Sequence, residues 1–468
     1  MSRPRPALAG VVGAAATVCF ACWCAVTVRP RYSHDDAEPE ILNQAWRLAQ
    51  GESLYRSIDT PPFLHTAYPP LYFGLLACLL RSFGLSYLPA KLLSLVSALA
   101  IGAGLVRLCR LWGRPPPRGA WVLGLLFLVP AFLYNTARVH PQMLAVALSL
   151  WAFVFLLSER FAVAVILSPL VAVLGIYTKQ SQLALPIASL VWLALRRPRW
   201  LAPYAGVLLL AGLAPLAWLE RATDGLFWRN IVQWNRLAYD PLQIPGILIH
   251  HAGPLGVALA LAAAACWRRV RDERWELVDA YFVAALATTV VACGRIGAHG
   301  QYVVELLVVA LALLLRATEF PALPGRETLV AVQIGFLLLY APFFVFIEEG
   351  RFALASARAA ARIDPLLPTH PGPILSQQGS FALFDAGGIQ VQLFQFSALS
   401  RAGLWDEQRL CRQVDDHVFA WVITLFPIED GIESDDDLER FTPELVAALK
   451  RSYAREALIE PYFLYRPR

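Results

Sequence analysis

Residues 29–72 read RPRYSHDDAEPEILNQAWRLAQGESLYRSIDTPPFLHTAYPPLY and form the only long polar interruption in the apolar first half of the chain. Asp35, Asp36, Glu38 and Glu40 fall within six residues, just after an apolar segment. An amphipathic helical pattern and a Tyr-Pro-Pro-Leu-Tyr turn follow before apolar sequence resumes. Carboxylates beside aromatic and proline residues at the end of an apolar segment indicate a site that faces lipid at a membrane surface.

The composition of the whole chain is that of a protein that crosses a membrane several times. Of its 468 residues, 57% are hydrophobic and only 16% are charged, whereas a soluble domain carries about 25% charged residues. The net charge of +5 comes from basic residues in short segments between apolar stretches. We therefore expect contacts with membrane lipids and no nucleic-acid partner.

Eleven apolar segments are candidates for membrane-spanning helices. They cover residues 8–28, 87–106, 119–136, 141–158, 161–177, 181–195, 201–219, 245–266, 278–293, 301–316 and 328–347. With this count the arginine clusters fall on one side of the membrane, which predicts a cytoplasmic N-terminus. A twelfth span at residues 68–84 would place most of the arginine clusters on the outer side of the membrane. We therefore predict a juxtamembrane or re-entrant helix at these residues.

The composition changes after Gly350, where short strand-like runs alternate with helical ones. The strand-like runs are Pro373–Gln377, Phe381–Phe384 and His417–Leu425, and the helical runs are Trp405–Asp415 and Pro443–Ala457. We predict a helical membrane domain over residues 1–349, with a first outer loop at 29–86, and a soluble α/β domain over residues 350–468. The number of spans places this second domain outside the cytoplasm.

The first-loop acids have two interpretations. Asp35 or Asp36 is placed to take a proton at the membrane surface, or one of them caps the helix whose first turn holds Glu38. Lys179, followed by Gln180 at the outer end of an apolar segment, either binds an anion or extends to lipid headgroups. The sequence leaves both alternatives open.

Other polar residues are expected at the same face of the membrane. Arg138 suits a phosphate or a first-loop acid, and His65, His140 and His299 are candidate metal ligands or ordinary hydrogen-bonded side chains. The segment from Gly294 to Gln301 is rich in small residues, which allows close approach of a ligand or of another helix. We expect Arg295, Tyr302 and Glu305 in or beside this segment, and Tyr68 in the first loop, to line a substrate cavity.

Several motifs in this order resemble the GT-C superfamily of polyprenyl-phosphate-sugar-dependent glycosyltransferases. The likeness is to the family 39 type, related to protein mannosyltransferases and the lipid A aminoarabinose transferase. It covers the membrane half through the acidic first loop, GESLY at 51–55, YPPLYF at 68–73, YTKQSQ at 177–182 and GAHGQYVVEL at 297–306. The segment FDAGGIQVQLFQFSALSRAGLWD at 384–406 is similar to the outer domain of some members.

The resemblance implies a GT-C-like membrane fold and an inverting transfer of a hexose or pentose from a polyprenyl-phosphate donor to a hydroxyl group. The acceptor is a lipid, a glycan or a protein, and the reaction takes place on the outer face of the plasma membrane, the inner membrane of a bacterium. A first-loop Asp acts as the base in such proteins, often with a divalent metal ion nearby. This chain departs from the family pattern in the first loop, where Pro39 and extra acids blur which residue matches. It also departs at the start of the fourth span, where many relatives carry an Asp and this chain has His140-Pro141-Gln142. A flippase of lipid-linked sugars and a non-catalytic protein of envelope-glycan assembly are the alternatives.

Overall fold

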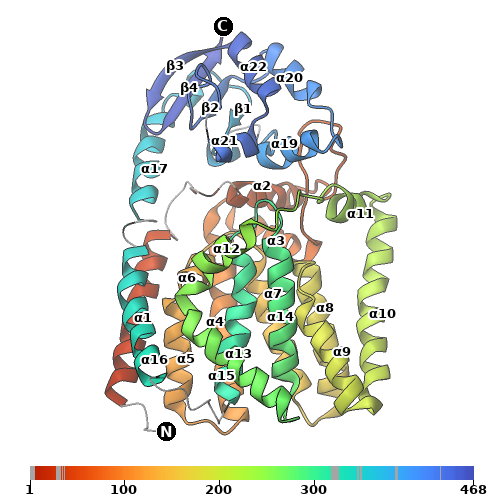
Figure 1. Cartoon of the computed structure of the whole chain (residues 1–468). Helices are drawn as coiled ribbons and strands as arrows, with labels where there is room; N and C mark the ends of the chain where they lie inside the picture. Colours follow the sequence, from red (N-terminus) through yellow and green to blue (C-terminus); the bar gives the residue numbers. More distant parts are fainter. Residues whose placement is uncertain are drawn as a thin grey trace.

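The computed structural model describes residues 6–27, 33, 35, 37–317, 326–344, 347, 350–384, 388–432 and 434–468. It consists of a helical bundle and, at one end of the bundle, a layer that contains a four-stranded sheet (Figure 1). The bundle helices are α1 (Pro6–Thr27), α4 (Tyr87–Leu111), α5 (Pro116–Leu128), α6 (Pro130–Thr136), α7 (Gln142–Leu156), α8 (Ser168–Thr178), α9 (Ala184–Arg196), α10 (Pro198–Ala222), α12 (Gln243–His251), α13 (Gly256–Arg271), α14 (Leu277–Cys293), α15 (Val304–Arg316) and α16 (Arg326–Phe343). The short helices α2 (Ala37–Ala49), α3 (Pro70–Phe83) and α11 (Leu226–Trp228) lie at the end of the bundle that faces the sheet (Figure 1).

Two of the described helices, α4 and α10, are long and apolar enough to cross a membrane. Two bent pairs, α5 with α6 at 79° and α12 with α13 at 53°, raise this number to four if each pair is one span. The bend between α5 and α6 lies at Val129-Pro130, where Val129 is extended and Pro130 starts the second helix. The eleven apolar segments coincide with helices or bent pairs, which confirms a mostly helical chain, and helix length supports two to four of the crossings.

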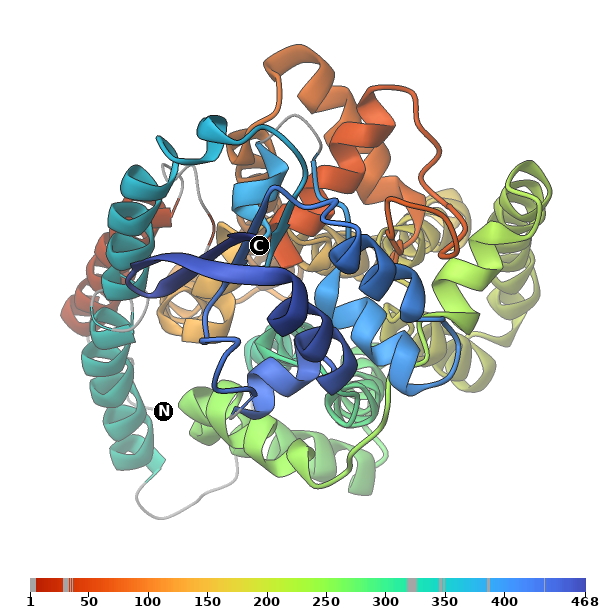
Figure 2. The same cartoon turned by 90° about the horizontal axis from the view of Figure 1, so that it is seen from above.

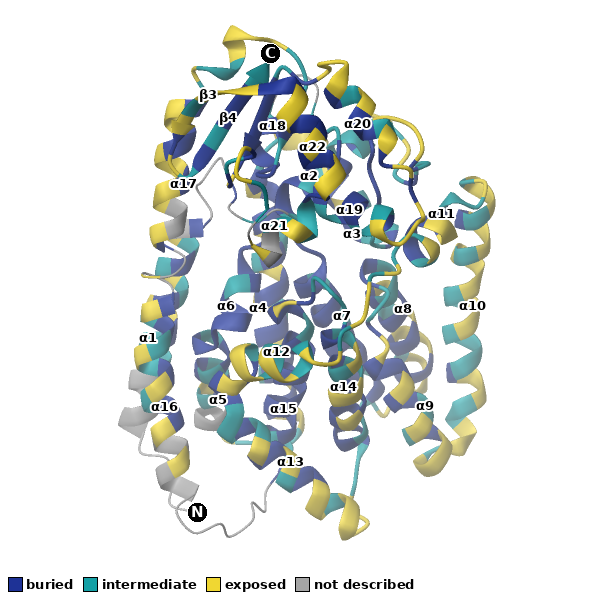
Figure 3. Cartoon of the chain, turned by 45° about the horizontal axis from the view of Figure 1, so that its top comes forward, coloured by how far each residue is buried: buried dark blue, intermediate teal, exposed yellow. Residues whose placement is uncertain are grey.

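Helix α10 lies at the edge of the bundle in two perpendicular views (Figures 1 and 2). Its apolar side chains Leu210 and Trp218 are exposed, and the helix has few buried positions (Figure 3). An exposed, uniformly apolar helix surface of this length is stable against lipid tails. The surface of α10 therefore fits a helix that faces the bilayer.

The segment at 68–84 forms α3, which has 14 residues and packs against α2. Tyr72, Phe73 and Leu76 of α3 share one buried cluster with Ile41 and Leu42 of α2. Pro70 at the first turn of α3 has no amide hydrogen to satisfy, so the two prolines start the helix without loss. The short helix predicted at the end of the bundle is present.

The sheet has the strand order β1-β2-β4-β3. Its strands are β1 (Ile374–Ser376), β2 (Trp421–Thr424), β3 (Tyr453–Ile459) and β4 (Tyr462–Pro467), and the helices of this layer are α17 (Gly350–Ile363), α18 (Ser380–Leu383), α19 (Leu393–Arg401), α20 (Gln408–Asp415), α21 (Asp435–Arg440) and α22 (Pro443–Ser452). β1 and β2 are parallel, and the other two pairings are antiparallel. The prediction of a mixed α/β composition in this part of the chain is therefore confirmed.

Two local predictions in this layer were wrong. The run Phe381–Phe384 forms most of α18 and its C-cap and not a strand, because a short apolar run fits a buried helical turn as well as a strand. The predicted helix Pro443–Ala457 ends at Ser452, where Tyr453 begins β3 with its side chain in the core. The β-branched and aromatic residues that favour strands are sparse in β3, so the tertiary pairing with β4 decides its structure.

The first loop and the sheet layer share a hydrophobic core. Phe63 packs edge to face against Trp405, with the ring centres 5.1 Å apart, and lies in the same buried cluster as Leu375 of β1. The Phe63 amide donates to the carbonyl oxygen of Gln390 at 2.7 Å. Residues far apart in the sequence thus form one wall above the bundle, and the candidate site lies below this wall.

Candidate active site

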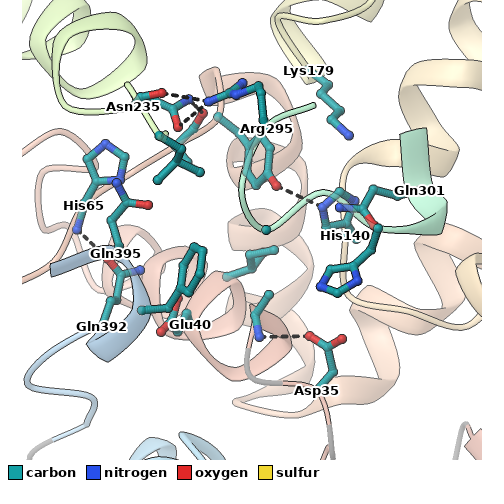
Figure 4. A pocket seen from close by; sticks show the side chains of 18 of the residues that line it. Asp35, Glu40, His65, His140, Lys179, Asn235, Arg295, Gln301, Gln392 and Gln395 are labelled. Carbon is teal, nitrogen blue, oxygen red and sulfur yellow. Dashed lines mark hydrogen bonds between the residues drawn. The ribbon is translucent and has the colours of Figure 1, made fainter. Parts of the chain in front are cut away.

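A cavity of about 320 Å³ lies where the first loop, the ends of several bundle helices and the sheet layer meet. Figure 4 shows Lys179 and Arg295 at one side of this pocket and Asp35 and Glu40 at the other. Of the sequence-predicted site residues, it is lined by Asp35, His65, Tyr68, Arg138, His140, Lys179, Gln180, Arg295, His299 and Tyr302. The fold therefore brings together residues from five separate parts of the sequence.

Lys179 is the most deeply buried cation of the pocket, with 1% of its surface exposed. It follows α8 directly in extended conformation, so that its side chain leaves the helix and turns inward. The ammonium group contacts the amide oxygen of Gln142 and lies 4.2 Å from the centre of the Tyr302 ring. Burial, together with the positive charges of Arg295 and Arg138, lowers the pKa of Lys179 to about 7.

A two-residue antiparallel bridge holds Arg295 in place. The segment around Tyr239 pairs with the segment around Arg295, through an Asp240 amide that donates to Gly294 O at 2.7 Å. A side chain at Gly294 would overlap the Tyr239 ring, with atoms 2.2 Å apart, so the close approach of this ring depends on the glycine. The guanidinium of Arg295 donates to Asn235 O at 2.7 Å, and Figure 4 shows this contact at the edge of the pocket.

Asp35 joins the first loop to the segment between α6 and α7. Its Oδ1 accepts hydrogen bonds from the amides of Ala37 at 2.8 Å and Glu38 at 3.2 Å, which makes it the cap of α2. Its Oδ2 accepts the Tyr134 hydroxyl at 2.9 Å and forms an ion pair with Arg138. The capping interpretation of Asp35 is confirmed, and the same carboxylate also faces the pocket.

The other first-loop acids differ in their surroundings. Glu38 is 5% exposed, accepts the Val139 amide at 2.8 Å and does not line the pocket. Glu40, half-buried on the next turn of α2, does line it (Figure 4). Asp36 lies outside the described residues. The pocket thus contains one carboxylate that the sequence analysis assigned to it, Asp35, and two that it did not, Glu40 of α2 and Glu439 of the sheet layer.

Of the three histidines that were candidate metal ligands, His65 and His140 make hydrogen bonds within the protein, and His299 lines the pocket. His65 Nε2 lies 2.8 Å from Asn230 O, and burial lowers the pKa of this imidazole to about 4. In His140, Nε2 lies 2.9 Å from the Tyr68 hydroxyl and Nδ1 accepts the Gln142 amide at 3.2 Å. In the described part of the chain, no three His, Cys, Asp or Glu side chains form a group that could hold a metal ion. These residues do not fit a metal centre, and no step below is assigned to a metal.

Two amide side chains present unsatisfied oxygen atoms. Gln180 Nε2 donates to Ala67 O at 2.8 Å, which fixes the orientation of the amide. Its Oε1, and the Oε1 of Gln301 on the same pocket wall, are buried without a hydrogen-bond partner among the described residues. A buried carbonyl oxygen of this kind needs a donor from a ligand or from water. Both oxygen atoms are suited to accept a hydrogen bond from a hydroxyl group of a ligand.

Glu305 does not reach the pocket surface. It is 6% exposed in the first turn of α15 and accepts the Tyr281 hydroxyl at 2.8 Å. Its charge still acts favourably on the ammonium of Lys179. The carboxylate therefore lies behind the pocket wall, where it supports the buried lysine.

The sequence analysis missed the contribution of the sheet layer to the pocket. From this layer the lining includes Gln392, Phe394, Gln395, Glu439 and Arg440, and from the first loop and the bundle side it also includes Gln44 and Asn235. Gln392 Oε1 accepts the His65 amide at 2.6 Å, so the sheet layer fixes the first loop over the pocket. The segment 384–406 carried a sequence pattern that could have predicted this contribution. Its Gln residues alternate with Phe and Leu, so that amide side chains stand next to apolar side chains that can be buried.

Solved structures share this architecture. ArnT from Cupriavidus metallidurans in the apo state superposes with a TM-score of 0.64 at 14% identity, and the match covers 98% of each chain. The fold is that of ArnT. ArnT bound to undecaprenyl phosphate gives a TM-score of 0.63 at 14% identity, over 97% of this chain and 98% of that one.

A more distant likeness is to the oligosaccharyltransferase AglB from Archaeoglobus fulgidus in complex with an inhibitory peptide and a dolichol-phosphate. It gives a TM-score of 0.51 at 12% identity, over 89% of this chain and 69% of AglB. No family model and no curated protein matches the sequence. The comparisons show that the chain shares the fold of ArnT and, more distantly, of AglB, and at these identities they show the fold alone.

Proposed function

We propose that the chain is a membrane glycosyltransferase that moves a sugar from a polyprenyl-phosphate donor to a hydroxyl acceptor. The observation that carries this proposal is the buried cation Lys179 beside Arg295 and Arg138, in one pocket with the carboxylates Asp35 and Glu40 at an end of the bundle. A buried positive cluster binds a phosphodiester, and a carboxylate within the same cavity takes a proton. ArnT and AglB, whose structures hold polyprenyl phosphates, have the same architecture.

The donor phosphate lies against Lys179 and Arg295 in this proposal. As the acceptor oxygen bonds to the anomeric carbon, the bond from that carbon to the phosphate oxygen breaks and polyprenyl phosphate leaves with the electron pair. The two cations stabilise the negative charge of the leaving phosphate. Attack from the opposite side inverts the configuration at the anomeric carbon, and the sugar hydroxyls reach the unsatisfied oxygens of Gln180 and Gln301.

Asp35 accepts the proton of the acceptor hydroxyl. It lines the pocket and also a second cavity of about 280 Å³, which shares Tyr134, Arg138 and His299 with the first. A donor in one cavity and an acceptor in the other would therefore meet at this carboxylate. Arg138, its ion-pair partner, moves to the donor phosphate when the donor binds, and this exchange frees Asp35 as a base. Glu40 and Glu439 are the other carboxylates that line the pocket, and the experiment separates Asp35 from Glu40, its neighbour in the first loop.

The test uses the purified full chain in lipid nanodiscs with a panel of radiolabelled polyprenyl-phosphate sugars. Sugar transfer or release by the wild type, lost in Asp35→Asn and kept in Glu40→Gln and in the exposed first-loop control Asp59→Asn, supports the proposal. Asn caps a helix as well as Asp does, so Asp35→Asn tests the base with the cap kept. Turnover that survives in Asp35→Asn and is lost in Glu40→Gln moves the base to Glu40. Donor binding without turnover in the wild type contradicts an enzyme and favours a flippase or an assembly protein.

A further inference from the structure

A second polar cavity lies at the end of the bundle opposite to the sheet layer. It has a volume of about 570 Å³ and is formed by the last turns of α9, α13 and α15 and by the segment between α13 and α14. Figure 1 shows these helix ends far from the sheet, at the level where α10 begins. Because α10 is long enough to cross a membrane, its start marks the membrane surface opposite to the candidate active site.

The lining of this cavity is basic. Five arginines, Arg196, Arg268, Arg269, Arg274 and Arg316, face three carboxylates. Glu276 accepts hydrogen bonds from Nε and Nη2 of Arg316 at 2.7 and 2.6 Å. Asp279, behind the wall, pairs with Arg269, so the five arginines exceed the nearby carboxylates by one charge.

Arg269 is held by two carboxylates. Its Nε bonds both oxygens of Asp279 at 3.0 Å, and its buried Nη2 forms an ion pair with Glu276 Oε2 at 3.5 Å but makes no hydrogen bond within the described structure. A buried guanidinium N–H that faces a basic cavity is stabilised by an anionic oxygen. Arg268, one residue before it, is exposed at the same cavity.

The neighbourhood of the cavity is apolar and aromatic. A cavity of about 200 Å³, lined mainly by Trp112, Phe153, Leu156 and Leu157, shares Trp192 and Glu276 with the basic one. Trp275 carries Arg196 over its ring at 4.9 Å, and tryptophans are typical of the membrane–water boundary. A free phosphate would use only the basic cavity, whereas a lipid would use both.

We propose that these two adjoining cavities bind an anionic phospholipid, with the phosphate in the arginine-lined cavity and the start of an acyl chain in the apolar one. The arginines supply the charge and the fixed donors that a phosphodiester prefers. This site is separate from the candidate active site and does not depend on the proposed transferase reaction.

The test measures lipid binding to the purified full chain by native mass spectrometry, with phosphatidylglycerol and phosphatidylcholine as probes. We expect phosphatidylglycerol to bind roughly tenfold tighter than phosphatidylcholine. The double variant Arg268→Gln with Arg274→Gln should lose this preference. The matched control, Arg107→Gln with Arg271→Gln, removes the same charge from exposed positions at the same end of the bundle, outside the cavity, and should keep it.

Three results would overturn the proposal. Equal binding of the two lipids by the wild type removes the preference for an anionic headgroup. Equal losses in the two double variants show a non-specific effect of surface charge. Competition by glycerol 3-phosphate at the concentrations at which phosphatidylglycerol binds shows a pocket for free anions. If a double variant fails to fold, Arg268→Gln against Arg271→Gln makes the same comparison.

Discussion

Lys179 combines burial, crowding by other cations and a place on a pocket wall. Its ammonium group contacts a neutral amide and the face of an aromatic ring, and Arg295 and Arg138 act unfavourably on its charge. A protein keeps such an arrangement at a cost in stability, because the charge is desolvated without full compensation. An anionic ligand supplies the missing charge, so this residue gives the first two predictions.

We expect Lys179→Gln to weaken the binding of undecaprenyl phosphate by about 10- to 100-fold, the range that one charge-assisted hydrogen bond to a phosphate contributes. Binding to protein in phosphatidylcholine nanodiscs measures this directly. Lys91→Gln is the control, because Lys91 is a buried lysine that does not line the pocket. Similar losses in the two variants would show that removal of any buried ammonium group, and not loss of a phosphate contact, explains the effect.

The pH dependence of donor binding follows from the lowered pKa. Below about pH 7 the amine of Lys179 carries its charge, and above it the amine of the empty pocket is increasingly neutral. A bound phosphodiester stabilises the ammonium form and raises its pKa, so binding above pH 7 takes up a proton. We expect the affinity to be level below pH 7 and to fall by up to about tenfold per pH unit from pH 7 to 9.

The measurement is the affinity for a phosphodiester-linked polyprenyl sugar, whose phosphate does not titrate in this range. Lys179→Arg is the matched variant, because an arginine stays charged at every pH used and should give a level profile. Burial and the nearby charges of Lys179 and Arg138 hold the pKa of His140 well below its usual value, so this imidazole stays neutral throughout. A level profile in the wild type would contradict the assignment to Lys179.

Among the helices and loops, α2 shows what the sequence could and could not predict. Asp35 as a helix cap was predictable from the residue type and the apolar pattern that follows. The helical spacing also distinguishes the two glutamates of α2. Glu38 lies three and four residues before Ile41 and Leu42, on the face of the helix that is buried. Glu40 lies four residues before Gln44, on the face that lines the pocket. The part played by Asn235, Gln392 and Gln395 could not be predicted, because it depends on contacts between segments 150 residues or more apart in the sequence.

The loop that holds Arg295 gives a prediction about backbone conformation. Gly297 has a φ of +76°, and a methyl group there would lie 2.8 Å from the Phe394 ring of α19. We expect Gly297→Ala to destabilise the protein by about 1–3 kcal/mol and to move Phe394 off the pocket, with loss of donor binding. Gly113→Ala is the control, since Gly113 has a φ of +62° and open space around it. The midpoint temperature of thermal unfolding should fall in both variants, whereas donor binding should be lost in Gly297→Ala alone.

Across the molecule, the sheet layer and the first loop form one wall, although about 330 residues separate their contacts along the chain. This explains why the predicted boundary at residue 350 says little about the site. The C-terminal part supplies one wall of a pocket whose cations Lys179, Arg138 and Arg295 come from the bundle part. The shared fold with ArnT at 14% identity agrees with this, because the arrangement of segments persists where the sequence does not.

The coupling of the two parts can be measured amide by amide. The amide of His65 donates to the side chain of Gln392 at 2.6 Å, whereas the amide of Phe63 donates to the main-chain oxygen of Gln390 at 2.7 Å. In Gln392→Ala the buried His65 amide loses its acceptor, which costs about 1–2 kcal/mol. We therefore expect its hydrogen exchange to become roughly 5- to 30-fold faster, with a smaller change at Phe63. Gln390→Ala keeps both hydrogen bonds and should leave both rates unchanged. Faster exchange at both amides in both variants would mean that the sheet layer separates from the first loop as a unit, and that side-chain contacts at the pocket do not hold the wall closed.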